Sequence, residues 1–204
     1  MIAGVILAAG DSSRMGFPKQ LAEYKGKTIL ETVVDTVTNN LDETVVVLGH
    51  ENDTITEKLD FKDSTILINE NWEEGIVSSI RTALFYLSEN KEIDSAMFFM
   101  ADQPSVNNKI IEKLIKTKKK EDIDIGCASE LAPSDWRVVK EQETGDAMDS
   151  GWKTWRGNVR TKCNSMQTQI DNAANMAAFI ALFTYTKQGD GSYTRPLGEF
   201  PTKE

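Results

Sequence analysis

The chain contains little of what builds disulfide-stapled or metal-rich folds. Among its 204 residues there are only two cysteines and one histidine. Cys127 and Cys163 are too few for a disulfide framework, and they lie too far apart in the sequence for a metal-binding motif. His50 has no Ser/His/Asp set or metal cluster near it in the sequence, so we assign it no catalytic role. The simplest setting for such a chain is a reduced cytoplasm.

Long apolar runs and an excess of positive charge are missing as well. No stretch reaches the roughly 18 apolar residues that a membrane helix needs, and a strand pattern begins at residue 2. We therefore expect neither a membrane span nor a signal peptide. The net charge of −9 argues against a general nucleic-acid surface. An acidic chain can still bind a triphosphate where cations gather at the site and a divalent metal helps.

Residues 1–129 alternate between strand and helix patterns. Short apolar runs, mostly rich in branched or aromatic residues, predict strands at 2–7, 44–48, 65–68, 96–100 and 123–128. Apolar stripes of helical period predict helices around 29–37, 76–87 and 110–115. The basic run 116–120 is typical of a solvated helix end. The alternation predicts an α/β fold with a Rossmann-like, doubly wound, mostly parallel sheet, whose ligand binds at the carboxyl ends of the strands.

Residues 130–204 follow a different pattern, with three of the four tryptophans and no strong parallel-strand signal. Apolar stripes at 152–163 and 166–180 predict a mainly helical C-terminal part, in which the tryptophans pack or form a partner surface. The stretch 187–204 is expected to be a loop or a loosely held end. We therefore expect a nucleotide-binding domain at 1–129 and a divergent, mainly helical segment at 130–204.

The segment with the clearest chemical content follows the first predicted strand. Small residues there let the backbone approach a polyphosphate, so that free N–H groups point at its oxygens. Arg14 and Lys19 come after the turn, either as phosphate-binding groups or as ordinary surface cations. The segment is neither a Walker loop nor a GxGxxG turn. We predict a nucleoside triphosphate site that these cations form with Leu7, Ala8, Ala9, Gly10, Ser12 and Ser13.

Two further segments are expected at the same edge of the sheet. Asp102 comes just after a predicted strand, where a carboxylate either holds Mg²⁺ against the triphosphate or caps a turn. A predicted helix start offers N–H groups and hydroxyls to the nucleotide or the acceptor, unless its polar residues only begin the helix. Its candidate residues are Gly75, Ser78, Ser79 and Arg81. Arg81 is either a phosphate contact or part of a surface ion pair.

The pattern LAAGxSxRMGxxK at residues 7–19 resembles the signature of the MobA-like nucleotidyltransferases. Four more segments are similar to that family in the same order: PKQL with YKG at 18–26, VLGH at 47–50, NWEEGIVSSIR at 71–81 and MADQP at 100–104. The related guanylyltransferases usually carry LAGG where this chain has LAAG. Within the family the first 129 residues are thus most similar to the molybdenum cofactor cytidylyltransferases.

The resemblance implies transfer of CMP from CTP to a phosphorylated acceptor, molybdopterin, with release of pyrophosphate. It implies catalytic roles for Arg14, Lys19 and Asp102, with Mg²⁺ on Asp102 and on a second carboxylate that the sequence does not identify. A molybdoenzyme or its chaperone would be the protein partner. The alternatives are a guanylyltransferase, a sugar- or alditol-phosphate cytidylyltransferase, or a non-catalytic nucleotide-binding or assembly protein.

From residue 130 onward the chain departs from the family pattern. The Gly-His-Pro segment that usually follows the metal motif is not found. Residues 134–140 (SDWRVVK), with 143–145 and Trp155-Arg156, faintly resemble the C-terminal part of phage tail-fibre assembly proteins. On that reading the chain is a hybrid, with a nucleotidyltransferase half joined to unrelated helical sequence.

Overall fold

A computed structural model describes residues 1–12 and 15–203. The chain forms two compact units, Met1–Ile111 and Glu112–Glu204, which are described separately below. The boundary between the units, after residue 111, thus falls earlier in the chain than the domain boundary expected after residue 129.

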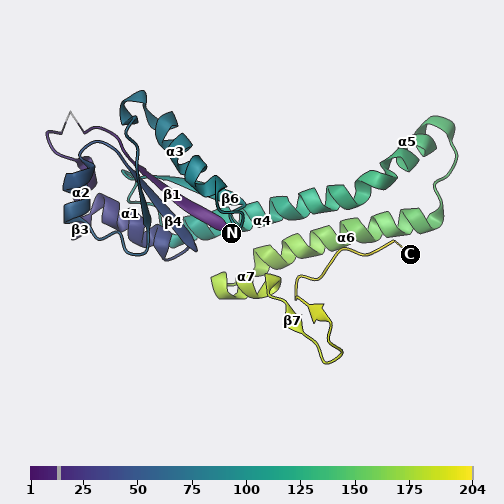
Figure 1. The fold of residues 1–204 in the computed structure, drawn as a ribbon. Helices are drawn as coiled ribbons and strands as arrows, with labels where there is room; N and C mark the ends of the chain where they lie inside the picture. The colour runs from purple at the N-terminus through teal and green to yellow at the C-terminus, as the bar shows by residue number, and fades with distance from the viewer. Residues whose placement is uncertain (13–14, 204) are drawn as a thin grey trace. The chain divides into compact units, whose positions relative to one another are not determined.

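The first unit is built on a parallel sheet (Figure 1). Its four strands run in the order β5-β4-β1-β6. They are β1 (Ile2–Ala8), β4 (Glu43–Leu48), β5 (Thr65–Ile68) and β6 (Ser95–Met100). The pairing is parallel throughout, with Val5 of β1 opposite Val45 on one side and Phe98 on the other. β1 and β4 are almost entirely buried, which agrees with the apolar sequence of β1 and the apolar run 45–48 of β4.

Helices cover both faces of this sheet, as the alternation of side chains along β1 requires. Val5 and the other odd-numbered residues of β1 pack in one cluster with Ala83 and Leu87 of α3 (Ile76–Ser88). Gly4 faces the opposite way, against Val37 of α1 (Ile29–Thr38). Successive side chains of a strand point to opposite faces, so α1 and α3 lie on different sides of the sheet. The prediction of a doubly wound α/β fold is confirmed.

Short elements complete the first unit. A capping box begins α1: the Thr28 Oγ1 accepts from the Glu31 N–H at 3.1 Å, and a Glu31 carboxylate oxygen accepts from the Thr28 N–H at 2.9 Å. The remaining elements are the 3-10 helix η1 (Lys19–Leu21), the hairpin β2 (Glu23–Tyr24) and β3 (Lys27–Thr28), α2 (Asn52–Lys58) and the 3-10 helix η2 (Trp72–Glu74).

The prediction of a strand at 123–128 is wrong, because this stretch belongs to α4 (Asn108–Leu131). Ile123 is buried whereas Ile125, two residues later, is 66% exposed. Residues two apart lie on the same face of a strand but on nearly opposite sides of a helix, so this contrast fits a helix. The alternation Ile-Asp-Ile had suggested a strand. The basic run 116–120 therefore lies inside a helix and does not end one.

The second unit is mainly helical, as expected. After α4 come the 3-10 helix η3 (Ala132–Ser134), α5 (Asp135–Thr144), α6 (Ser150–Asn172) and α7 (Met176–Phe183). α6 buries a stripe that starts at Trp155 and continues to Ile170, so much of the two predicted stripes belongs to one helix. The second stripe is broken before 180, where Asn175 caps α7 by accepting from the Ala178 N–H at 2.8 Å.

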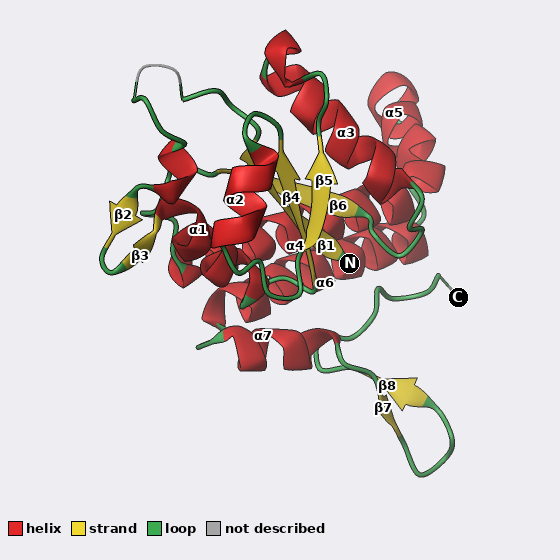
Figure 2. Ribbon diagram, turned by 60° about the vertical axis from the view of Figure 1, so that its left-hand side comes forward, coloured by secondary structure: helices red, strands yellow, loops and turns green. Residues whose placement is uncertain are grey.

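The described residues 187–203 are largely loop, as expected, but a hairpin and contacts with α6 fix parts of them. Lys187 ends β7 (Thr186–Lys187), which pairs with β8 (Tyr193–Thr194) in this hairpin (Figure 2). Leu197 is buried. The indole N–H of Trp155 donates to the Pro201 carbonyl at 2.8 Å, and the Lys162 ammonium donates to the Leu197 carbonyl at 2.7 Å. These bonds hold the C-terminal stretch against α6.

Candidate functional site

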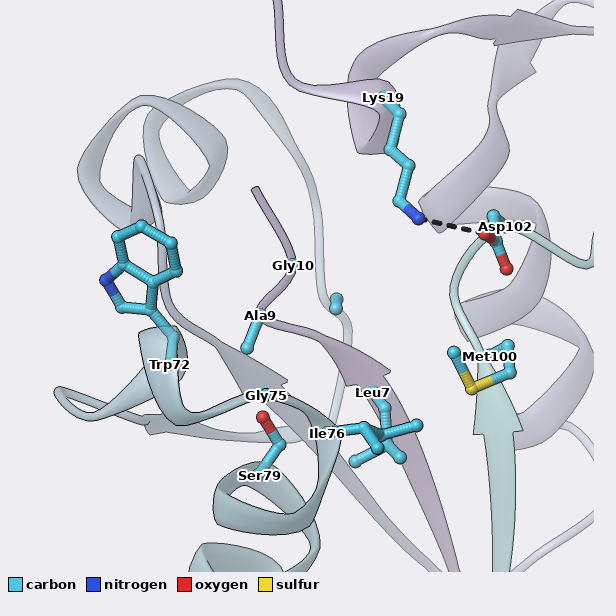
Figure 3. Close-up of a pocket in the computed structure, with 11 residues that line it drawn as sticks. Leu7, Ala9, Gly10, Lys19, Trp72, Gly75, Ile76, Ser79, Met100 and Asp102 are labelled. Carbon is cyan, nitrogen blue, oxygen red and sulfur yellow. Dashed lines mark hydrogen bonds and ion pairs between the residues drawn. The ribbon is translucent and has the colours of Figure 1, made fainter. Parts of the chain in front are cut away.

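A cavity of about 120 Å³ opens at the carboxyl ends of β1 and β6 (Figure 3). Three stretches form it: the end of β1 with the bend that follows, the turn after β6, and the segment between β5 and α3. Its lining residues are Leu7, Ala8, Ala9, Gly10, Lys19, Trp72, Gly75, Ile76, Ser79, Met100 and Asp102.

The position of the cavity follows from the topology of the sheet. From β1 the chain moves outward to β4 and β5, and then returns to place β6 on the other side of β1. The connections after β1 and β6 thus leave the sheet in different directions and open a crevice between them. In open α/β sheets such a switch point is where ligands bind.

A buried glutamine fixes the bend after β1. Gln20 is 1% exposed, and its side-chain N–H groups donate to the Ala8 carbonyl at 2.7 Å and to the Gly10 carbonyl at 3.3 Å. Ser12 supports the same bend, because its Oγ accepts from the Lys19 backbone N–H at 2.8 Å. The small residues at the end of β1 are therefore held in one shape by side chains that come later in the chain.

Lys19 and Asp102 meet at the rim of the cavity. The Lys19 Nζ lies 2.8 Å from Asp102 Oδ2, and the side chains are 32% and 43% exposed. The turn that carries Asp102 is tied to the sheet, because the Ala101 N–H donates to the Leu7 carbonyl at 3.1 Å. Figure 3 shows the lysine side chain reaching across to the carboxylate. One positive and one negative group are thus available to a ligand at this point.

At the start of α3, hydrogen bonds from an asparagine side chain shape the side of the cavity that Gly75, Ile76 and Ser79 line. Asn69, which is buried, donates from Nδ2 to Ser78 Oγ at 2.8 Å and to Ser79 Oγ at 3.0 Å. Ser78 Oγ in turn is 2.7 Å from the Gly75 carbonyl. Gly75 has φ 89°, a backbone conformation that glycine adopts without strain. The network fixes Ser79, whose hydroxyl faces the cavity (Figure 3).

The backbone at Gly49 lies close to Trp72 and to Ala9. A Cβ on Gly49 would lie 2.6 Å from the Trp72 Cβ and 2.8 Å from the Ala9 carbonyl oxygen, so only glycine fits. His50 packs its ring against the Trp72 ring, with a centroid separation of 4.8 Å. His50 therefore has a packing contact beside the cavity.

The structure brings most of the predicted site residues together. Eight of them line the cavity: Leu7, Ala8, Ala9, Gly10, Lys19, Gly75, Ser79 and Asp102. Ser12 and Ser78 are absent from that lining and bond to the backbone around it. Arg81 is exposed on α3 and does not line the cavity. Ser13 and Arg14 lie outside the described residues.

Sequence reasoning missed several residues that build this site. Trp72, Ile76 and Met100 line the cavity, while Gln20 and Asn69 hold its walls from behind. All except Asn69 fall inside the family-like segments, but none carries a charge that would have marked it. No sequence signal marks Gln20, because the Ala8 and Gly10 carbonyls that it bonds come within its reach only in the fold.

The donor set at the cavity suits only a metal ion that is shared with a ligand. Among the described lining residues Asp102 alone has a carboxylate, and the described part of the chain holds no cluster of three or more metal-binding side chains. Mg²⁺ commonly takes one or two carboxylates and completes its shell with phosphate oxygens and water. Asp102 fits that arrangement, but the described lining residues do not supply a full set of protein ligands for a metal ion.

Separately, within the described residues no helix has the length and apolar character needed to cross a membrane.

The fold and the cavity define a doubly wound α/β protein with a ligand site at the switch point of its sheet. Residues 4–144 match the model of the MobA-like NTP transferase domain, and the chain belongs to this family. The match extends beyond residue 129, where the sequence resemblance had been expected to end.

Several curated proteins are similar to the first part of the chain. A probable molybdenum cofactor guanylyltransferase of Natranaerobius thermophilus is 29% identical over 125 residues, covering 61% of this chain and 58% of that protein. Nicotine blue oxidoreductase of Paenarthrobacter nicotinovorans is 26% identical over 132 residues, covering 64% and 63%. A probable molybdenum cofactor guanylyltransferase of Bacillus cereus is 31% identical over 122 residues, covering 58% of each. The chain thus spans about three fifths of the length of these relatives.

The crystal structure of Rv0371C from Mycobacterium tuberculosis H37Rv, in complex with manganese, is similar in fold. The TM-score is 0.50 at 24% sequence identity, and the match covers 57% of this chain and 59% of that one. At this level the similarity supports the fold and nothing finer.

Proposed function

We propose that the protein is a nucleotidyltransferase that binds a nucleoside triphosphate in the cavity between β1 and β6. One observation carries the proposal: the bend after β1, the Lys19 ammonium and the Asp102 carboxylate all line the same cavity. Backbone N–H groups of the bend would face the phosphates, and Lys19 would contact their oxygens. Membership of the NTP transferase family supports the same assignment.

In the proposed reaction an acceptor phosphate attacks the α-phosphorus of the nucleotide in line, and pyrophosphate leaves. The attacking phosphate is already anionic, so the site needs no general base. The work of the chain is to position both substrates and to offset charge as the bond to pyrophosphate breaks, with Lys19 and, by proposal, Arg14 as the cations. A divalent ion, by proposal Mg²⁺ held by Asp102, would supply further charge neutralisation when bound.

For the nucleotide and the acceptor we propose CTP and a phosphorylated pterin, because residues 7–10 read LAAG. The names of two relatives favour GTP as the second candidate, since both are called guanylyltransferases. A sugar- or alditol-phosphate acceptor and a non-catalytic nucleotide-binding role are the remaining alternatives. A molybdoenzyme or its chaperone is the proposed protein partner.

The experiment measures pyrophosphate release with CTP, GTP and ATP against a panel of phosphorylated acceptors that includes the pterin. We expect turnover with one nucleotide, and a large loss in Lys19→Met and Asp102→Asn. Lys27→Met is a matched control, because Lys27 also pairs with an aspartate, Asp35, but does not line the cavity. Nucleotide binding without turnover on any acceptor would refute the enzymatic role. Equal losses in Lys19→Met and Lys27→Met would refute the assignment of the cavity.

A further inference from the structure

We propose that Lys19 competes with the divalent cation for the Asp102 carboxylate, so that metal and triphosphate bind together and metal alone binds poorly. The Lys19 ammonium would leave Asp102 for phosphate oxygens at the moment when the dication takes its place. The part of this inference that concerns the triphosphate rests on the proposed function. The competition between Lys19 and the metal does not.

The geometry places the Lys19 ammonium on one oxygen of the Asp102 carboxylate. Lys19 Nζ is 2.8 Å from Asp102 Oδ2, well within the range of a charge-assisted hydrogen bond. A metal ion that binds the same lone pair of Oδ2, at the usual oxygen distance of about 2.1 Å, would take the place of the ammonium. Ammonium and dication therefore exclude each other at this atom, unless the carboxylate turns away from the lysine.

The backbones of both residues are anchored, so exchange needs only side-chain movement. Ser12 Oγ accepts from the Lys19 N–H at 2.8 Å, and the Ala101 N–H beside Asp102 donates to the Leu7 carbonyl. The lysine stem has four rotatable bonds and is partly exposed, which lets the ammonium swing within the cavity. Lys19 also lines the cavity in which the triphosphate would bind.

The charge balance at Asp102 strengthens the competition between Lys19 and the metal. Among the described lining residues no second carboxylate reinforces Asp102, so its pairing with Lys19 leaves no net negative charge there for a dication. A triphosphate changes this balance, because it brings several negative charges that attract both the ammonium and the metal. Partly exposed ion pairs are weak, so we expect the pairing with Lys19 to lower the affinity for the metal by only about two- to fivefold.

The test measures binding of Mn²⁺ alone, by the electron paramagnetic resonance signal of the free ion. We expect Lys19→Met to bind Mn²⁺ about two- to fivefold tighter than the unmodified protein. Lys27→Met removes the same charge from the same unit, but Asp35 keeps its second partner Lys62 at 3.2 Å, so no carboxylate is freed. It should leave Mn²⁺ affinity nearly unchanged.

Two more variants locate the effect. The tightening should vanish when Asp102→Asn is added to Lys19→Met, because the freed carboxylate is then missing. Lys19→Arg should bind Mn²⁺ as weakly as the unmodified protein, since it restores a cation. Lys19→Gln serves if the methionine variant folds poorly. If Lys19→Met is no tighter than Lys27→Met, or if the tightening survives Asp102→Asn, the competition is refuted.

A second arm adds CTP, and in parallel GTP, to the same titrations. With triphosphate present the order should reverse, because Lys19→Met has lost a phosphate contact and binds the metal–nucleotide pair more weakly. Failure of either nucleotide to bind the unmodified protein would overturn the proposed function. The Mn²⁺-only titration would still decide whether Lys19 competes with the metal for Asp102. Failure of the proposed function and failure of the competition are therefore distinguishable.

Discussion

Replacement of Gln20 by leucine tests whether the shape of the bend after β1 is imposed by a side chain. Gln20→Leu keeps a similar volume but removes both donors of the amide. The Ala8 carbonyl, which is buried in this contact, loses a bond of 2.7 Å, and the Gly10 carbonyl loses a weaker one of 3.3 Å at a partly buried position. We expect the first unit to lose stability and the bend to loosen.

The magnitude follows from the burial of each acceptor. A buried carbonyl left without a partner costs about 1–3 kcal/mol, whereas water can replace the partner of a partly exposed one. The Ala8 carbonyl therefore accounts for most of the loss, and we expect the free energy of unfolding of the first unit to fall by about 2 kcal/mol. Nucleotide affinity should fall with it, since the Gly10 segment is no longer preorganised.

Native-state hydrogen exchange of the β1 amides is the measurement, because it reports opening of the first unit without assuming that both units unfold together. Gln103→Leu is the control, since Gln103 is an exposed glutamine of the same unit. Equal protection of β1 in the two variants would show that the Gln20 bonds contribute nothing, and the argument for a preset bend would fail.

Three further predictions follow from local geometry. Gly4→Ala should destabilise the first unit by about 1–3 kcal/mol in urea unfolding, because the new Cβ would lie 2.3 Å from Val37 Cγ1. Burial, and then the hydrogen bond with Cys127, raise the pKa of the Cys163 thiol to about 12, so iodoacetamide at about pH 8 should alkylate Cys163 only as fast as the second unit opens. Burial raises the pKa of Asp35, but hydrogen bonds from two lysines outweigh it and leave the pKa below its ordinary value. The stabilisation from this carboxylate is thus present above the ordinary pKa and lost as the pH falls through the lowered one, so the stability difference between the unmodified protein and Asp35→Asn should shrink below about pH 4.

Sequence predicted the first unit well because its two central strands, β1 and β4, are buried on both faces. β1 and residues 45–48 of β4 are continuous apolar runs, and α1 and α3 each have an apolar stripe. The stretch 123–128 failed because a short alternation fits both periods. The opposite burial of Ile123 and Ile125, which a strand would place on one face, distinguishes helix from strand there, and burial is a tertiary property.

The site residues also divide into those that the sequence could predict and those that it could not. Lys19 and Asp102 were predictable, because a charge after a strand has a limited set of roles and parallel strands end at one edge. Gln20 and Asn69 were not, because their function is to satisfy backbone and hydroxyl groups that come together only in the fold. Uncharged polar residues of this kind can be recognised only from a structure that shows which buried groups they bond.

The proposed preference for CTP rests on the residue at position 9. Ala9, which separates LAAG from LAGG, is only 4% exposed, and its methyl group would lie 2.9 Å from a Cβ at position 49. A methyl group offers a base no hydrogen bond, and this one packs into the wall beside Gly49. Any influence of Ala9 on the choice between CTP and GTP must therefore act through the shape of the wall, in which Ala9, Gly49 and Trp72 fit together. Exchanging Ala9 for glycine alone should then change affinity for both nucleotides more than it changes the ratio between them.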